Sequence, residues 1–244
     1  MADQIPVLYS DDDILVVDKS AGILAVPDRY DPDAPVAVSL LRAAWGRLFV
    51  VHRIDKDTSG ILVYARNAEA HRTLNGAFGT GAVRKVYRAL VRGAPAWDEE
   101  GCELPLRADG DRLHRTIVDA RGGKASATRF ATLERYRGTG SFPGAALIEA
   151  KPETGRTHQI RVHLAALGFP CLCDPLYGDG KPLLLSAFKR RWKGDLYAER
   201  PLLARAALHA LSAEFAHPRT GAELRFEAPL HKDMRASVAQ LSKD

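Results

Sequence analysis

Val51-His52-Arg53-Ile54-Asp55-Lys56-Asp57-Thr58-Ser59-Gly60, leading into ILVYAR at residues 61–66, is the stretch that decides the fold. The first ten residues are polar and rich in turn formers, whereas residues 61–66 have the apolar and aromatic character of a buried strand. A carboxylate that leads into a turn just before a buried strand sits at the edge of a sheet, where a substrate could reach it. The stretch therefore predicts a sheet with a charged, accessible loop at one edge.

The elements on either side show no regular alternation of strand and helix. Asn67 is the predicted N-cap of a helix through Phe78, which Gly79 ends, and Thr157 is the predicted cap of a helix over residues 158–167. A further short helix is predicted at residues 39–45. Strands are predicted at residues 14–17, 83–91, 125–136, 145–150, 208–215 and 224–228. This order favours an α+β fold with a mixed, largely antiparallel sheet flanked by helices and loops over a doubly wound sheet.

The composition favours a polyanionic partner and a reducing compartment. The 244 residues carry a formal net charge of +5, and 46% of them are hydrophobic, which is enough for a sizeable core. Three cysteines suit a cytosolic protein better than a disulfide scaffold, and Cys171 and Cys173 lack the second pair that a zinc site needs. No apolar run reaches the length of a membrane span. We expect a soluble cytoplasmic protein.

Four polar segments are candidates for chemistry, and each has a plainer interpretation. One of them, Leu208-His209-Ala210 with the turn at His217-Pro218, suggests little beyond a strand and a hairpin. Asp55 could act on a substrate or simply cap its own turn. Lys85 and Tyr87 share one strand face, where the ring could stack on a base or belong to the core. His158 and Arg161 share a helix face near a helix N-terminus, where free N–H groups favour anions, although a capped and solvated first turn would look the same. The residues alone leave these alternatives open.

Taken together, the segments resemble the RluA family of RNA pseudouridine synthases. His52-Arg53-Ile54-Asp55 with Thr58-Ser59-Gly60 is similar to the family's catalytic H-R-L-D-x-x-T-S-G, with Ile in place of Leu. The remaining motifs occur in the expected order, with Ser20 where the family usually has Pro. They are Val16–Gly22, Arg84-Lys85-Val86-Tyr87, Gly123-Lys124-Ala125 to Thr128, Thr154–His163, and Leu208-His209-Ala210 through His217–Gly221 to Pro229.

The resemblance implies a pseudouridine synthase catalytic domain over residues 1–244 with a central active-site cleft. No separate N-terminal RNA-binding domain of the S4 type is expected, and residues 181–205 are expected to be a surface insertion. It also implies that Asp55 is the catalytic carboxylate, with Tyr87 against the uracil and Arg161 paired with Asp55. The residues expected to bind substrate are His52, Arg53, Thr58, Lys85, Arg156 and His158. No metal and no organic cofactor are expected, because the isomerisation is redox-neutral.

The implied partner is structured RNA, either ribosomal or transfer RNA, with no role for DNA or a membrane and with the protein as a monomer. Arg53 is expected to fill the space that a flipped-out nucleotide leaves. Phosphates would be held by a basic surface of Arg84, Arg88, Lys189, Arg190 and Arg191. Two alternatives remain: a non-catalytic RNA-binding or ribosome-assembly factor, and a metal hydrolase. The hydrolase would use His158 and His163, which are poorly placed on a helix to chelate one ion.

Overall fold

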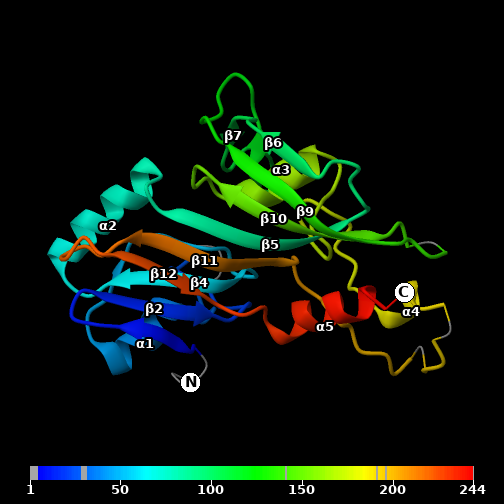
Figure 1. The fold of residues 1–244 in the computed structure, drawn as a ribbon, viewed down its shortest axis with the longest axis horizontal. Helices are drawn as coiled ribbons and strands as arrows, with labels where there is room; N and C mark the ends of the chain where they lie inside the picture. The colour runs from blue at the N-terminus through cyan, green and yellow to red at the C-terminus, as the bar shows by residue number, and fades with distance from the viewer. Residues whose placement is uncertain (1–4, 29–31, 141, 191, 196, 244) are drawn as a thin grey trace. The chain divides into compact units, whose positions relative to one another are not determined.

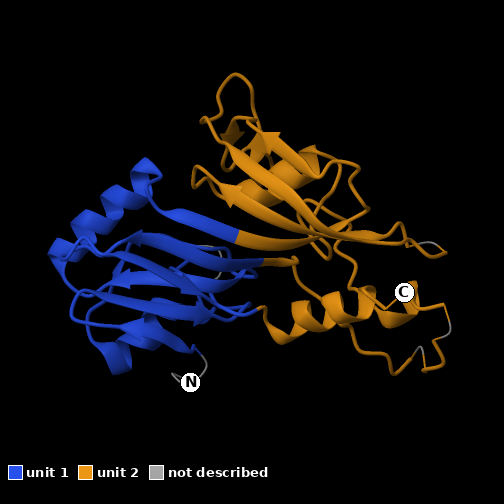
Figure 2. Ribbon diagram, in the orientation of Figure 1, with its two compact units in different colours: residues 1–86, 209–229 blue, residues 87–208, 230–244 orange. Residues whose placement is uncertain are grey.

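The computed structural model describes residues 5–28, 32–140, 142–190, 192–195 and 197–243. The chain divides into two compact units, residues 1–86 with 209–229 and residues 87–208 with 230–244 (Figure 2). Strand β5, Arg84–Arg92, begins in the first unit and continues in the second. The expectation of one catalytic domain over the whole chain stays a prediction.

The first unit is a sheet in the order β1-β2-β4-β11, with β3 added to β4 and β12 to β11 (Figure 1). Strands β4 and β11 run parallel, whereas the pairs β1–β2, β2–β4, β3–β4 and β11–β12 are antiparallel. The strands are β1 Val7–Ser10, β2 Ile14–Lys19, β3 Phe49–Val50, β4 Ser59–Ala65, β11 Leu208–Ala216 and β12 Glu223–Glu227. The helices are α1 Ala37–Trp45 and α2 Ala68–Thr80.

Local sequence accounts for most of these elements. All six residues of β2 and all seven of β4 are buried, which confirms the two predicted core strands. Asn67 caps α2 as predicted, because its side chain accepts the N–H of Ala70 at 2.9 Å. Gly79 does not end this helix. The helix continues to Thr80 and ends at Gly81, whose φ of 80° is the left-handed conformation that a helix C-terminus often takes.

The second unit holds a sheet in the order β5-β10-β9-β6 and a small two-stranded sheet of β7 and β8. All the pairs in it are antiparallel. Besides β5, its strands are β6 Glu99–Cys102, β7 Leu106–Arg107, β8 Ile117–Val118, β9 Thr128–Tyr136 and β10 Ala145–Pro152. Its helices are α3 Gln159–Ala166, α4 Leu185–Phe188 and α5 Lys232–Leu241. The fold is thus a mixed, mostly antiparallel α+β fold, as predicted.

Two apolar clusters form the core of the second unit, one on each face of its sheet. Val91 of β5 packs with Ile160 and Leu164 of α3, which are four residues apart and so form an inward-facing stripe of that helix. Leu90, the neighbouring residue of β5, belongs to the other cluster with Met234 of α5. Both faces of this part of β5 are therefore covered, so its alternation of apolar and polar residues is weak.

Three apolar residues of the described part of 181–205 pack into this second core. Leu183, Phe188 and Leu203 are 4%, 2% and 1% exposed and belong to the cluster around α5. The expectation that this segment is an insertion stays a prediction. Arg191, one of its expected phosphate-binding residues, lies outside the described residues. Within the described part of the chain, no helix has both the length and the hydropathy to cross a membrane.

Candidate active site

Asp55 lies in the first unit, on the loop between β3 and β4. The loop closes with a turn in which the N–H of Thr58 donates to the carbonyl of Asp55 at 3.1 Å. Ile54 and Thr58 are buried, 5% and 2% exposed, whereas Asp55 is half-buried and Arg53 is exposed. The buried residues fix the loop on either side of Asp55, which is itself only half-buried.

A fully buried lysine stabilises this loop through hydrogen bonds to backbone carbonyls. Lys19, at the end of β2, is 0% exposed, and its ammonium donates to the carbonyls of Ser20 at 2.9 Å, Ile23 at 2.7 Å and Lys56 at 3.0 Å. The N–H of Gly22 also donates to the Lys56 carbonyl, at 2.9 Å. A buried charge needs such a set of acceptors. The segment around Lys19 therefore fixes the residue next to Asp55, a role that the sequence analysis did not assign to it.

The strand that follows Asp55 is held by a distant histidine. Ser59 contacts Nδ1 of His209 at 2.9 Å, and Nε2 of that ring donates to the carbonyl of Ala228 at 3.1 Å. Gly60 pairs with Ala210 of β11 and has a φ of +108°. A Cβ at Gly60 would lie 2.1 Å from the Ala210 carbonyl oxygen. Only glycine fits there, which explains the glycine that closes the turn motif.

His52 is engaged with the scaffold of the first unit. Its Nε2 accepts the N–H of Val63 at 2.9 Å, and its ring stacks on Phe78 with centroids 4.2 Å apart. Burial, with a further contribution from the charge of Lys85, lowers the pKa of His52 to about 3. The ring is thus a neutral acceptor that orients the start of the loop. Its predicted contact with substrate stays a prediction.

Lys85 and Tyr87 alternate along β5, and both are half-buried. Burial lowers the pKa of Lys85 from its usual value. Tyr87 packs against the α3-side core of the second unit, next to residues such as Ala150, its partner on β10. Partial burial of the ring is compatible with a stacking platform, and its contact with a uracil stays a prediction.

The segment from Thr154 to His163 is fixed by buried polar contacts in the second unit, not by a capped and solvated first turn. Thr157 does not cap α3. The N-cap is His158, in the left-handed conformation with φ of 53° and without a side-chain cap bond. Gln159, 4% exposed, accepts the N–H of Arg156 at 2.9 Å and donates to the carbonyl of Ala127 at 2.9 Å. The same amide donates to Oγ1 of Thr128 at 3.0 Å, so it ties the start of α3 to the start of β9.

His163 and Arg156 also form hydrogen bonds within the protein. His163 is fully buried, and its two nitrogens lie 3.0 Å from Thr128 Oγ1 and 3.1 Å from Ser126 Oγ. Burial lowers its pKa. Arg156 is exposed and donates through Nε to the Ala125 carbonyl at 3.0 Å. His163 therefore stabilises the scaffold, and Arg156 remains a candidate for binding substrate.

Arg161 forms a buried bidentate ion pair with Asp174, a residue that the sequence analysis missed. Nε and Nη2 of Arg161 lie 2.7 Å from Oδ2 and Oδ1 of Asp174, and the two side chains are 5% and 0% exposed. Arg161 and His158 both contact Tyr177, although His158 is the N-cap and lies outside the helix proper. The predicted pairing of Arg161 with Asp55 stays a prediction.

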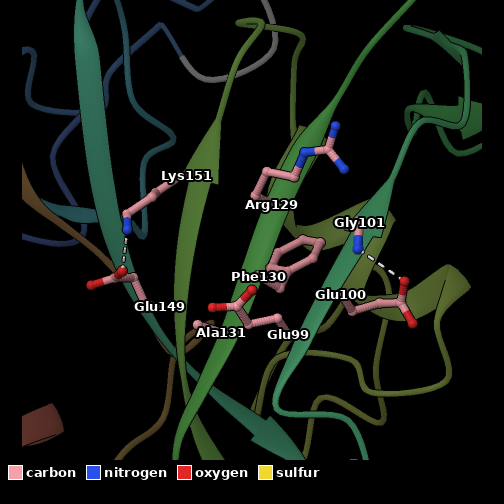
Figure 3. Close-up of a pocket in the computed structure, with 8 residues that line it drawn as sticks. All are labelled: Glu99, Glu100, Gly101, Arg129, Phe130, Ala131, Glu149 and Lys151. Atoms are coloured by element: carbon pink, nitrogen blue, oxygen red, sulfur yellow. Dashed lines mark hydrogen bonds and ion pairs between the residues drawn. The ribbon is translucent and has the colours of Figure 1, made fainter.

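Two further features lie apart from these residues. A cavity of about 420 Å³ on the sheet of the second unit (Figure 3) is lined by Glu99, Glu100, Gly101, Arg129, Phe130, Ala131, Glu149 and Lys151. Its glutamates disfavour an RNA phosphate. In the described part of the first unit, ligand atoms of Asp11, Asp13 and His217 lie within 4.8 Å of one another. Because Asp13 pairs with Arg219 at 2.7 Å, that cluster is already partly neutralised without an ion.

The expected basic surface is also partly neutralised. Arg84 is paired with Glu214 and Arg88 with Glu149, the latter at 2.6 Å. These partners reduce the charge that the two arginines can offer to phosphates. Binding of phosphates by the described members of the basic surface stays a prediction.

Comparison with known proteins shows the family. Residues 13–166 match a family described as RNA pseudouridylate synthase. The chain is 38% identical over 244 residues to ribosomal large subunit pseudouridine synthase D of Xanthomonas campestris pv. campestris, covering 98% of this chain and 70% of that protein. It is also 38% identical over 237 residues to ribosomal large subunit pseudouridine synthase C of Haemophilus ducreyi, covering 96% and 68%.

A solved structure shows the same fold. The structure of human RNA pseudouridylate synthase domain containing 1 superimposes with a TM-score of 0.70 at 26% identity, covering 94% of this chain and 85% of that one. Sequence motifs, family match and fold thus agree over most of the chain. The chain belongs to the RNA pseudouridine synthases, within the RluA family that its motifs resemble.

Proposed function

We propose that this RNA pseudouridine synthase isomerises uridines of ribosomal RNA, with Asp55 as the catalytic carboxylate. Support for the substrate comes from relatives that are named ribosomal large subunit pseudouridine synthases and align over nearly the whole chain. Action on ribosomal RNA would place the protein in the cytoplasm. Transfer RNA remains the other candidate substrate, and the monomeric state stays a prediction.

The observation that carries the assignment of Asp55 is the way its loop is held. The residues before and after it are buried or hydrogen-bonded to the scaffold, yet Asp55 itself is only half-buried. A catalytic group needs this combination of a fixed position and access to the substrate. A residue that only capped its own turn would not need the buried ammonium of Lys19 to fix the neighbouring Lys56 carbonyl.

The reaction breaks the bond from N1 of uracil to C1′ and forms a bond from C5 to C1′. The proton on C5 is lost, and N1 gains one, so that the atoms balance without a redox partner. We assign to Asp55 the step that assists cleavage, through attack at C1′, attack at C6 or removal of a sugar proton. Tyr87 is assigned to the uracil face, and Arg161 to pairing with Asp55.

Release of tritium from 5-tritiated uridine in large-subunit ribosomal RNA tests this assignment. Asp55→Asn should lower the rate by about 1000-fold or more while RNA binding survives. Asp57→Asn, two residues along the same turn, is the matched control and should keep the rate near that of the wild type. Wild-type tritium release by Asp55→Asn would overturn the assignment of Asp55. No tritium release and no carbodiimide-reactive product with the wild-type protein would instead favour a non-catalytic RNA-binding factor.

A further inference from the structure

Two residues of the turn after α3 hold the candidate site residues of that helix. Asp174 receives both Nε and Nη2 of Arg161, at 2.7 Å each, and its Oδ1 also accepts the N–H groups of Leu176 at 2.9 Å and Tyr177 at 3.2 Å. Burial raises the pKa of Asp174, but the hydrogen bonds and charge of Arg161 and the two backbone donors outweigh it, so the pKa is lowered. The carboxylate is therefore ionised and fixes the guanidinium plane.

Tyr177 contacts both Arg161 and His158. Its ring centroid lies 5.1 Å from the guanidinium carbon of Arg161, within the range of a cation–π contact. Its hydroxyl lies 2.9 Å from Nδ1 of His158 and accepts the N–H of Thr116 at 3.0 Å. Burial raises the pKa of Tyr177, so the phenol keeps its proton and can donate it to Nδ1. That bond would put the proton of a neutral His158 ring on Nε2.

The hairpin of β7 and β8 fixes the same turn from another side. Nη1 of Arg115 donates to the carbonyl of Leu176 at 2.9 Å, next to the bond from Thr116 to Tyr177. Asp111 in turn holds Arg115, through Nε at 2.7 Å and the backbone N–H at 3.0 Å. A turn held at this many points can orient a guanidinium and an imidazole with little freedom.

We propose that Asp174 and Tyr177 are positioning residues for the reaction, which act through Arg161 and His158. The inference rests on the proposed function. Asp174 sets the direction of the Arg161 guanidinium, and Tyr177 sets the orientation and tautomer of the His158 ring. Ile160 and Leu164, the core residues of α3, contact neither Asp174 nor the hydroxyl of Tyr177 in the interactions described above, and they pack the helix against the sheet.

The experiment compares two aspartates of the second unit in single-turnover tritium release, with the RNA dissociation constant measured separately. Asp174→Asn should lower the rate constant by about 100-fold while the dissociation constant stays within about 3-fold. Asp233→Asn is the matched control, because Asp233 binds Nε and Nη2 of Arg205 at 2.7 and 3.0 Å. That variant should keep a rate within about 3-fold of the wild type. A purely structural role of Asp174 would lower affinity and rate together, and would overturn the proposal.

Tyr177→Phe keeps the ring beside Arg161 and removes only the hydroxyl, so it decides the question should Asp174→Asn fail to fold. We expect a loss of about 10-fold in rate with unchanged affinity. Its control is Tyr136→Phe, which removes a buried hydroxyl bonded to Glu134 at 2.9 Å. Equal rates for both variants would overturn the role of Tyr177 and leave the proposed function standing. An inactive wild-type protein would overturn the proposed function and this inference with it.

Discussion

Replacing Gly60 by alanine should disrupt the pairing of β4 and β11 behind the Asp55 loop. The new Cβ would lie 2.1 Å from the Ala210 carbonyl oxygen, so that the two strands must separate. Overpacking of this kind costs about 1–3 kcal/mol. The φ of +108° adds backbone strain of about 1–3 kcal/mol, while the stiffer unfolded chain offsets about 0.4–1 kcal/mol. The expected loss in the free energy of unfolding is about 3 kcal/mol.

Urea unfolding followed by circular dichroism measures this loss, and Gly76→Ala is the matched control. Gly76 lies inside α2, in the same unit, and a Cβ there would meet nothing within 4 Å. Alanine at this helical position should raise stability by about 0.5–1 kcal/mol. If Gly60→Ala unfolds at the same urea concentration as the wild type, the close approach of the two strands is not a constraint and our reasoning about the turn motif is wrong.

Substitution of His52 and of Asn67, both in the first unit, gives two further predictions. The folded pKa of His52, about 3, lies below its unfolded value of about 6.5, so the unfolded state binds the proton first and stability is lost as pH falls through this window. At pH 4.5 the loss relative to neutral pH should be about 2–3 kcal/mol by urea unfolding, and His52→Gln should abolish that share of it. Asn67→Ala removes the acceptor for the Ala70 N–H and should cost about 1 kcal/mol in thermal unfolding; an unchanged midpoint would contradict the cap.

The sequence predicted the main elements because their signals are local. The buried strands β2 and β4 and the inward stripe of α3 follow from runs and spacings of apolar residues. The cap of α2 at Asn67 follows from a side chain that bonds three residues ahead. The ends of elements were less certain: α2 passes Gly79 and stops at Gly81, and α3 begins after His158 although Thr157 is the better capping residue.

The sequence named the residues of the candidate site but predicted only some of their contacts. Motif spacing placed His158 and Arg161 on one helix face, and both contact Tyr177. The partner of Arg161 was not predicted, because Asp174 lies in an irregular turn where a carboxylate has no distinctive spacing. The signal that was present is the short Asp174–Tyr177 interval after α3, in which an acid and an aromatic follow a buried run.

The sequence by itself determined the fold class, the family and the identity of Asp55 as the candidate carboxylate, because motifs and periodicity are properties of neighbouring residues. Tertiary structure alone decided three contacts. Lys19 supports the Asp55 loop by binding the carbonyl of Lys56, 37 positions away in the sequence, and Ser59 contacts His209, 150 positions away. Arg161 binds Asp174. Such contacts depend on which buried charges and polar groups find partners once distant strands pair. Burial makes each partner obligatory, but no local pattern states where it lies.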